Sequence, residues 1–250
     1  MVYRKTVWLL LFLIFYGICY AADPAAVEIR QITAATWMHT SWSIIEGKKY
    51  DSHGLIIKTP SGIVLVDTCW NVEQTVNLLK DIKTRFNIPV ITAIITHAHQ
   101  DRIGGIEALL ENDIKTVSTP LTAQKAAAAG FAEPSPELDK ELMQLEFGSF
   151  KIEVFYPGPG HTEDNIVVWI PADYVLFGGC LIKALENKNL GNVKDADVPH
   201  WAGSVQNVRM RYPGIKIVIP GHGRPGGADL LRHTIELAAR LLPIQTDSKE

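Results

Sequence analysis

The chain has 250 residues, of which 47% are hydrophobic and 20% charged, and its formal net charge at pH 7 is −3. This length and apolar content suffice to bury the core of one large domain or of two fused halves. Because the positive charges form no block or stripe, nucleic acid is not expected as a partner.

The N-terminal segment has the layout of a secretory signal peptide. A basic Arg-Lys pair precedes a continuous apolar run over residues 7–18, and residues 19–21 resemble a small-residue cleavage site. The run is shorter than the roughly 20 residues that a membrane-spanning helix needs. An uncleaved anchor is one alternative. A lipid anchor on Cys19 is disfavoured, because the preceding Ile18 stands where a small residue would be wanted.

This leader divides the chain into two parts. We predict that residues 1–21 are removed and that residues 22–250 form a single domain with no membrane association. The mature protein is then periplasmic or secreted. Nothing in its sequence demands a second chain, so a monomer is expected.

Two cysteines, Cys69 and Cys180, follow the leader. A small secreted domain that depended on disulfides would carry more of them. In an oxidising compartment a lone functional thiol needs protection, and coordination of a metal ion provides it. A disulfide between these two cysteines is the alternative.

Strand-like runs rich in Val, Ile and aromatic residues alternate with helical patterns along the rest of the chain. The expected strands cover residues 54–58, 63–67, 91–96, 151–156, 166–170, 174–177 and 216–219. The expected helices cover residues 72–86, 106–111, 122–129, 203–211 and 228–242. Strands interleaved with helices predict a layered α/β protein, and the hairpin character of the first strands predicts mixed sheets.

A run of metal-capable residues follows the strand expected over residues 91–96. His97, His99 and Asp101 alternate along the chain, and residues two apart in an extended segment face the same side. His97 and His99 can therefore bind one ion, while Asp101, where the chain turns, can face a second ion. Two surface histidines in a loop are the alternative for this motif taken alone.

Three further strand ends deliver metal-capable side chains. His161, Cys180 and His222 each follow an expected strand and stand beside a turn that contains glycine. Glycine adopts backbone conformations that other residues resist and lets the chain approach a site closely. Together with the HxHxD motif, these residues predict one site for two ions.

The types of donor indicate zinc. Imidazole, thiolate and carboxylate all bind zinc, and a catalytic zinc site keeps one position for water. A thiolate disfavours magnesium and calcium, which prefer oxygen ligands. Zinc lowers the pKa of bound water to about 7, so no side-chain nucleophile is required. The sequence therefore predicts a hydrolase with two Zn²⁺ ions per chain.

Four segments resemble the metallo-β-lactamases, in particular the first subclass, which uses three histidines at one zinc and Asp, Cys and His at the other. The segments are residues 97–102 (HAHQDR), 157–162 (PGPGHT), 178–183 (GGCLIK) and 190–192 (LGN). The resemblance extends over nearly all of the chain after the leader. It implies an αβ/βα sandwich of two mixed β-sheets, with helices on the outer faces and the site at one edge.

The resemblance also implies roles for the six donors. His97, His99 and His161 would bind the first zinc ion, and Asp101, Cys180 and His222 the second. A hydroxide held between the ions, with Asp101 orienting it, would attack the carbonyl carbon of a small-molecule β-lactam substrate. The expected activity is hydrolysis of the amide bond of penicillins, cephalosporins and carbapenems, which confers antibiotic resistance.

Lys183 and Asn192 are the expected catalytic and substrate-binding residues outside the donor set. By the resemblance, Lys183 would bind the carboxylate next to the lactam ring, and Asn192 would help to polarise the lactam carbonyl. Residues 42–50 would form a hairpin flap over the substrate, with Trp42 as an apolar contact. A solvated lysine, a turn-forming asparagine and an ordinary hairpin are the alternatives.

Other residues near the motifs have secondary expected roles. Arg102 is expected to balance the anionic donors, Thr162 and Asp195 to be hydrogen-bond partners around the site, and Asp67 to organise its floor. Ordinary turn and salt-bridge roles are the alternatives. Trp70 is expected to pack. The histidines without partner spacing are expected to be structural or exposed: His39, His53, His200 and His233.

Two other classes of protein stay open. A thioester hydrolase or lactonase of the same fold typically reads HxHxDH and uses a bridging Asp. Here Arg102 replaces the final His, and Cys180 stands where that Asp would be. A zinc-binding protein without catalysis would have closed sites with four protein ligands. Six donors for two ions favour the catalytic interpretation.

Overall fold

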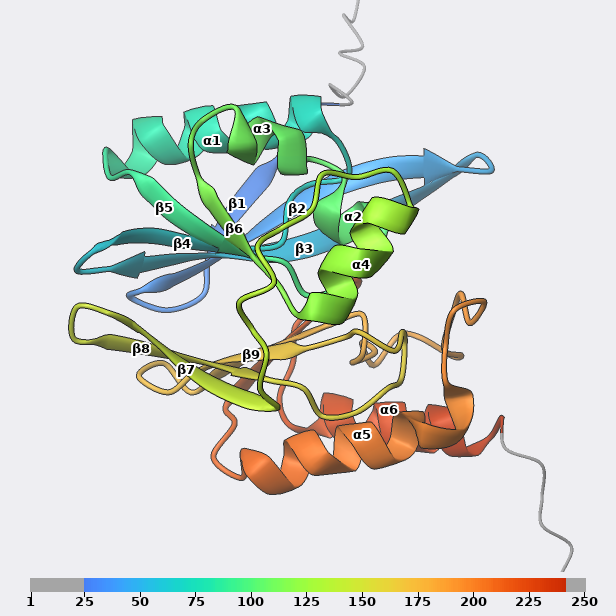
Figure 1. Cartoon of the computed structure of the whole chain (residues 1–250). Helices are drawn as coiled ribbons and strands as arrows, with labels where there is room; N and C mark the ends of the chain where they lie inside the picture. Colours follow the sequence, from blue (N-terminus) through green and yellow to red (C-terminus); the bar gives the residue numbers. More distant parts are fainter. Residues whose placement is uncertain (1–24, 242–250) are drawn as a thin grey trace, which may run out of the picture.

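Two β-sheets lie face to face in this protein, and helices cover their outer faces (Figure 1). The structure is a computed structural model that describes residues 25–241, so the expected leader over residues 1–21 lies outside the described residues. The expected αβ/βα sandwich of two mixed sheets is confirmed. Within the described part of the chain, no helix is long and apolar enough to cross a membrane.

The N-terminal half forms a six-stranded sheet in which the spatial order of the strands follows the chain. Strands β1 to β4 are antiparallel neighbours, whereas β4, β5 and β6 run parallel. Helices α1 and α3 lie over the outer face (Figure 1). The elements are β1 Glu28–Gln31, β2 Thr36–Ile45, β3 Lys48–Thr59, β4 Gly62–Val66, α1 Val72–Phe86, β5 Val90–Ile94, α2 Gln100–Ile103, α3 Ile106–Leu110, β6 Lys115–Val117 and α4 Pro120–Ala128.

The C-terminal half forms a five-stranded sheet in the order β11-β10-β9-β8-β7. Only the pair β10 and β11 is parallel, and the other neighbours are antiparallel. Helices α5 and α6 cover its outer face (Figure 1). The elements are β7 Leu142–Phe147, β8 Phe150–Phe155, β9 Val167–Ile170, β10 Val175–Gly179, α5 Val198–Arg211, β11 Ile217–Pro220 and α6 Asp229–Ala239.

The main apolar core fills the space between the two sheets. Side chains of both sheets meet there, among them Leu55 and Ile94 from the first sheet and Val168 and Phe177 from the second, all of them fully buried. Separate buried clusters lie between each sheet and its outer helices. Burial of apolar surface in these three layers holds the two halves together and fixes the edge where their loops meet.

The structure corrects several expected boundaries. The helix expected over residues 203–211 begins at Val198, because the Asp197 side chain accepts a hydrogen bond from the His200 backbone and caps the helix. Strands β1, β6 and β7, the first part of β2 and the short helix α2 were not expected from the sequence. β6 has three residues and β1 has four, too few for an alternating pattern to stand out.

The topology brings four strand ends to one edge of the sandwich. β8 and β10 both run antiparallel to β9, so they point the same way as each other and as β11. The segments that follow these three strands therefore emerge at one edge of the second sheet. The segment after β5 meets them from the first sheet, and these are the four segments that carry the predicted donors.

Candidate metal centre

The six predicted donors come together at this edge. His97 and His99 follow β5, Asp101 lies in the short helix α2, and the other three donors follow β8, β10 and β11. Two groups of donors lie within 4.8 Å of one another and could hold a metal ion: His97, His99 and His161, and His97, Asp101 and Cys180. The first donor, His97, and the last, His222, are 125 positions apart in the sequence, and the fold brings them into one site.

The three-histidine group has imidazole nitrogens that face one another. The Nδ1 atom of His99 lies 3.1 Å from the Nε2 atom of His161. The ring centroids of the three histidines lie 4.9–5.1 Å apart. Among the described residues, the buried Nε2 atom of His97 has no hydrogen-bond partner. Burial and neighbouring charge lower the pKa of His97 and of His161 well below the usual range, so both rings stay neutral.

Asp101, Cys180 and His222 form a second compact group. The Cys180 Sγ atom lies 3.4 Å from Asp101 Oδ2 and 3.3 Å from His222 Nε2. The distance between His222 Nε2 and Asp101 Oδ2 is 3.2 Å. All three pairs involve atoms that can bind metals, so His222 belongs to this group by its contacts with both other members. His97 also has a ring nitrogen within 4.8 Å of the donor atoms of Asp101 and Cys180, so it lies between the two groups.

These separations fit zinc. Two nitrogen or oxygen donors at about 2.0–2.1 Å from a tetrahedral zinc lie about 3.3–3.4 Å apart, and a sulfur and a nitrogen donor lie about 3.5–3.6 Å apart. The observed donor separations of 3.1–3.4 Å are close to these values. Each group supplies fewer than four donors, which is the arrangement of a catalytic rather than a structural zinc site.

The charges around the second group also favour a cation. Burial alone lowers the pKa of His222, but the interactions with Cys180 and Asp101 outweigh it and raise that pKa to about 10. Burial raises the pKa of Asp101, yet Arg102 and His222 together bring it well below its usual range. An ionised carboxylate therefore faces the position that a metal ion would take, beside the Cys180 sulfur.

Arg102 lies beneath the second group and is fully buried. Its Nε and Nη2 atoms donate hydrogen bonds of 2.8 and 2.7 Å to Asp101 Oδ2, and its Nη1 atom lies 3.4 Å from Asp67 Oδ2. It also donates to Ser52 Oγ and to the backbone oxygens of His53 and Gly221. The expected role of Arg102 in balancing the anionic donors agrees with these contacts.

Asp67 lies beneath the donors, in contact with Arg102 and with the segment that leads to His97. Its carboxylate accepts hydrogen bonds from the backbone and the hydroxyl of Thr96, which is the residue before His97. Asp67 itself has a φ of 61°, in the left-handed region that ends β4 sharply. Burial raises the pKa of Asp67 to about 7, against the opposing effects of Arg102 and Thr96. The carboxyl group thereby ties the ends of β4 and β5 together under the donors.

The sequence missed the contribution of Asp51. Its backbone oxygen accepts a 2.6 Å hydrogen bond from His222 Nδ1. This bond orients the ring so that its Nε2 atom faces Cys180 and Asp101. The Asp51 carboxylate accepts a hydrogen bond from the Gly223 backbone and lies 3.3 Å from His53 Nε2. This contact orients a donor through its second ring nitrogen, and no pattern in the sequence marks a backbone oxygen for that role.

Asp195 and Thr162 were expected to be hydrogen-bond partners around the site. Asp195 Oδ2 lies 3.1 Å from His99 Nε2, so this residue reaches the ring nitrogen that faces away from His161. The backbone of Thr162 donates to Asn165 Oδ1, whereas the buried Thr162 hydroxyl has no hydrogen-bond partner among the described residues. The expectation for Asp195 agrees with the structure, and that for the Thr162 hydroxyl is not supported.

Lys183 is buried, contrary to the alternative of a solvated lysine. Its Nζ atom lies 5.2 Å from the ring centroid of Trp201, and none of the ion pairs within residues 25–241 includes it. Burial lowers the pKa of Lys183, while Cys180 and Asp101 oppose that shift. A lysine without an internal carboxylate partner is free to meet the carboxylate of a ligand.

Asn192 and Trp42 are less closely connected to the donors. Asn192 is exposed, and its Oδ1 atom accepts a hydrogen bond from the Lys194 backbone. Trp42 lies where the hairpin of β2 and β3 leaves the sheet, with Lys49 Nζ 4.6 Å from its ring centroid and its backbone oxygen bonded to Gln74. Within the described residues, neither side chain forms a hydrogen bond with any of the six donors.

The remaining histidines and the second cysteine behave as structural or surface residues. His39 and His53 are buried, His200 is exposed beside Asp197, and His233 contacts the Asn187 backbone oxygen. Cys69 and Cys180 are both free, so the alternative of a disulfide between them is wrong. Burial raises the pKa of the Cys69 thiol to about 12, which keeps it protonated and unreactive.

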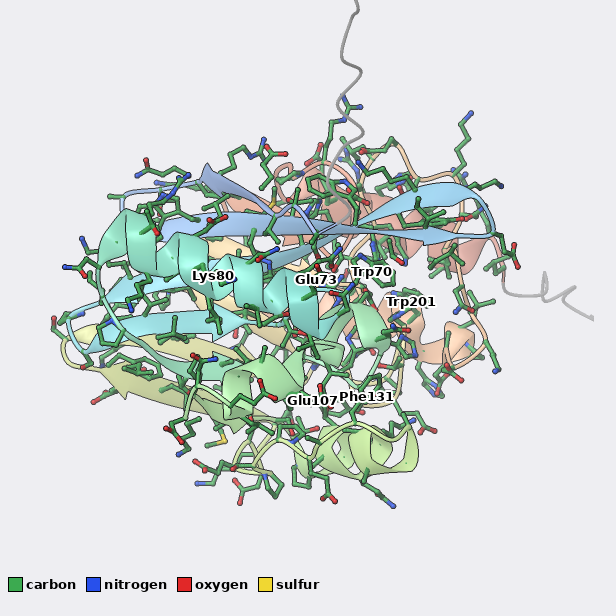
Figure 2. All side chains as sticks on the ribbon, turned by 90° about the horizontal axis from the view of Figure 1, so that it is seen from above. Trp70, Glu73, Lys80, Glu107, Phe131 and Trp201 are labelled. Atoms are coloured by element: carbon green, nitrogen blue, oxygen red, sulfur yellow. The ribbon has the colours of Figure 1, made fainter. Side chains whose placement is uncertain are left out.

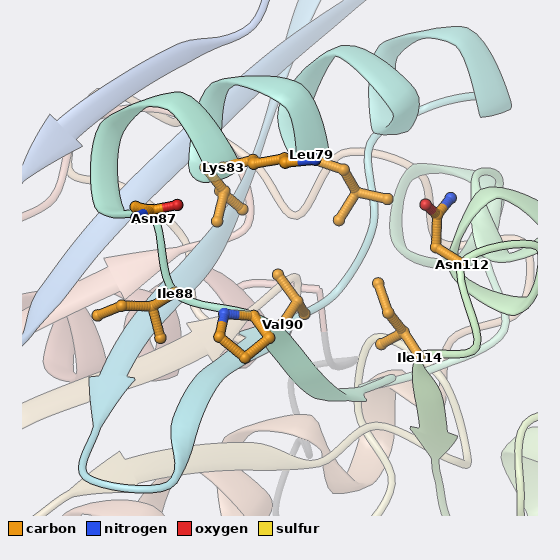
Figure 3. Close-up of a pocket in the computed structure, with 9 residues that line it drawn as sticks. Leu79, Lys83, Asn87, Ile88, Val90, Asn112 and Ile114 are labelled. Atoms are coloured by element: carbon orange, nitrogen blue, oxygen red, sulfur yellow. The ribbon is translucent and has the colours of Figure 1, made fainter.

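A separate pocket lies between the C-terminal end of α1 and the start of β5 (Figure 3). Its lining includes Leu79, Ile82 and Lys83. β5 begins at Val90 in this pocket, whereas His97 follows the opposite end of the strand. The pocket therefore lies away from the candidate metal centre and contains none of its donors.

Imidazole, carboxylate and thiolate donors at one edge of an αβ/βα sandwich define a class of metal-binding protein, and similarity to known proteins gives its family. Residues 51–222 match the family described as the metallo-beta-lactamase superfamily. The protein named Metallo-beta-lactamase type 2 from Bacillus sp. (strain 170) is 46% identical over 215 residues, which is 86% of this chain and 83% of the relative. A protein of the same name from Bacillus cereus is 45% identical over 215 residues, or 86% and 84% of the two chains.

A solved structure agrees with these relatives. The metallo-beta-lactamase from Pontibacter korlensis is 41% identical to this chain, with a TM-score of 0.82 over 86% of this chain and 99% of that one. The chain belongs to the metallo-β-lactamase superfamily. The family that the four sequence segments predicted is therefore confirmed.

Proposed function

We propose that this protein hydrolyses the amide bond of β-lactams with two zinc ions per chain. His97, His99 and His161 bind the first ion, and Asp101, Cys180 and His222 bind the second. The observation that carries the proposal is the pair of three-donor groups. The separation between His99 and His161 and all three separations in the second group are 3.1–3.4 Å, which suits zinc, and three donors per ion leave room for water and substrate. The names of the relatives support the same activity.

Different residues of the chain have different roles in the proposed reaction. Zinc at such a site supplies Lewis-acid activation of water and of a carbonyl group. Asp101 keeps its negative charge because Arg102 holds its carboxylate from below. Lys183 binds the carboxylate beside the lactam ring as a positive charge. The Oδ1 atom of Asn192 is engaged by the backbone, so its amide hydrogens are the part of the side chain that can donate to the lactam carbonyl oxygen.

We propose in addition that the protein acts in the periplasm or outside the cell, as a monomer, after removal of residues 1–21. The basic pair and apolar run of the leader support export. The proposed substrates are penicillins, cephalosporins and carbapenems, because each carries a carboxylate that Lys183 can bind. Hydrolysis of these compounds would confer antibiotic resistance on a cell that makes the protein.

Turnover of a panel of β-lactams tests the proposed activity. We expect the purified zinc-loaded protein to open the ring of at least one carbapenem or cephalosporin, and we expect a chelator to abolish that turnover until zinc is restored. Absorbance of the lactam ring measures the rate directly. A zinc-loaded, folded protein that opens no β-lactam ring would refute the proposal.

Replacing Lys183 with alanine is expected to raise KM for carboxylate-bearing β-lactams by roughly tenfold to a hundredfold, with a smaller effect on kcat. This range corresponds to the loss of a charge-assisted hydrogen bond worth about 1.5–3 kcal/mol. Steady-state kinetics on the purified variant measure it. Replacing the exposed Lys188 with alanine is the matched control and is expected to leave KM unchanged. An unchanged KM in the Lys183 variant would remove Lys183 from substrate binding.

A further inference from the structure

Trp201 lies between His161, a member of the three-histidine group, and Lys183. It lies in α5, where Figure 2 labels it, and is fully buried. Its ring centroid lies 5.7 Å from that of His161, at an interplanar angle of 63°. The Lys183 Nζ atom lies 5.2 Å from the same ring centroid. One indole therefore touches both a proposed zinc ligand and the proposed substrate-binding cation.

The backbone around Trp201 is built to hold this ring in one place. Its Nε1 atom donates a 2.8 Å hydrogen bond to the Leu181 backbone oxygen, in the turn between Cys180 and Lys183. On the other side, a Cβ atom at Gly160 would lie 3.2 Å from the indole and 2.5 Å from a Leu181 methyl group. Glycine at position 160 thus lets the segment that carries His161 pack directly on the ring.

Hydrogen bonds fasten α5 to that same segment. The Asp197 backbone donates to the Gly160 oxygen at 2.9 Å, and Ser204 Oγ donates to the Pro159 oxygen at 2.6 Å. The position of Trp201 relative to His161 is therefore fixed at two points of the helix. A ring held in this way can set the position of a flexible lysine side chain.

An aromatic partner has a different consequence for Lys183 than a carboxylate would have. A carboxylate would neutralise the ammonium group and compete with an anionic ligand. The face of an indole attracts the ammonium group through its quadrupole and leaves the positive charge uncompensated. None of the ion pairs of the described residues includes Lys183, which is consistent with this arrangement.

We propose that Trp201 is a positioning residue that holds the Lys183 ammonium group by a cation–π contact, ready for the carboxylate of the substrate. This inference rests on the proposed function of Lys183. It assigns to Trp201 no contact with the reacting atoms. Its effect on KM passes through Lys183.

A double-mutant cycle with Lys183 tests the proposal. We expect Trp201→Leu to raise KM for a chromogenic cephalosporin by roughly twofold to thirtyfold, the range of a cation–π contact. We expect little change in KM for the methyl ester of that cephalosporin, which lacks the negative charge. In a Lys183→Ala background, the effect of Trp201→Leu on KM should disappear. Equal effects in both backgrounds would overturn the proposal, because a merely structural role does not depend on Lys183.

Further variants keep the test decisive. Trp201→Phe keeps an aromatic face without the Nε1 hydrogen bond, and we expect it to raise KM less than Trp201→Leu does. If Trp201→Leu does not fold, the cycle is made with Trp201→Phe. Trp169→Phe is the matched control, since Trp169 stacks on Tyr212 at 5.1 Å between ring centroids and has no contact with Lys183 among those described. An equal rise of KM in the Trp169 control would also contradict the assignment.

A spectroscopic measurement separates this inference from the proposed function. The Lys183 ε-methylene protons should resonate upfield of those of the exposed lysines, because the Nζ atom next to them lies over the indole ring. We expect this displacement to be lost in Trp201→Leu and partly kept in Trp201→Phe. The measurement needs no turnover. An unshifted Lys183 resonance in the unmodified protein would refute the contact, whereas failure of the β-lactam panel would refute the proposed function alone.

Discussion

Replacing Arg102 with methionine is expected to lower the free energy of unfolding by about 3–5 kcal/mol, the usual cost of removing one partner from a buried ion pair. The fully buried guanidinium contacts two buried carboxylates, those of Asp101 and Asp67. Methionine fills similar volume, so the loss reports charge and hydrogen bonding more than packing. Urea denaturation of the zinc-loaded protein, followed by circular dichroism, measures the change.

Weaker binding of the second zinc ion is expected in the same variant. Arg102 donates two hydrogen bonds to the Asp101 oxygen that faces Cys180 and His222, so its loss frees a proposed ligand to turn. Loss of such an outer partner typically costs about 10–100-fold in metal affinity. Arg102→Lys keeps the charge without the planar pair of donors, and an intermediate loss is expected.

An arginine on the surface provides the control for these changes. Arg211 is partly exposed and lies 3.7 Å from Glu153, in a pair that contributes about 0–1 kcal/mol at most. Arg211→Met should therefore leave both stability and zinc affinity nearly unchanged. If Arg102→Met were as stable as this control and bound zinc equally well, the guanidinium would not be the support of the second group.

The donor set was predictable because the chemistry of its residues is local. The sequence alone shows the HxHxD motif, the glycine-containing turn before His161 and the glycines before Cys180. The strands that precede them are mostly buried and apolar, so their positions were also predictable, to within a few residues. Repeated delivery of donors by strand ends is what made a single site the expected outcome.

The supporting residues were less predictable, because their roles depend on contacts between distant segments. Asp51 acts through a backbone oxygen on His222, 171 positions away. Trp201 lies in a helix whose pattern explains its burial but does not say what its ring touches. Burial of Lys183 also depends on the fold, since lysine is usually exposed. The sequence shows which side chains are present, whereas the packing of the folded chain determines which of them are in contact.

Replacing Cys180 with serine is expected to remove the second zinc ion under conditions that leave the first one bound. The Sγ atom contacts both other members of its group, at 3.3 and 3.4 Å, and belongs to none of the contacts among the three histidines. A hydroxyl is a much poorer zinc ligand than a thiolate at neutral pH, because it stays protonated. The loss of affinity should exceed the roughly 10–100-fold that the loss of an outer partner costs.

Mass spectrometry under native conditions, over a series of zinc concentrations, measures this stoichiometry. We expect two ions in the unmodified protein and one tightly held ion in Cys180→Ser, with turnover of β-lactams reduced in step. Cys69→Ser is the matched control, because Cys69 is the other buried free thiol and lies outside the donor groups. That control should retain two ions. Two tightly held ions in Cys180→Ser would show that the thiolate is not a ligand and that the second site is built from other donors.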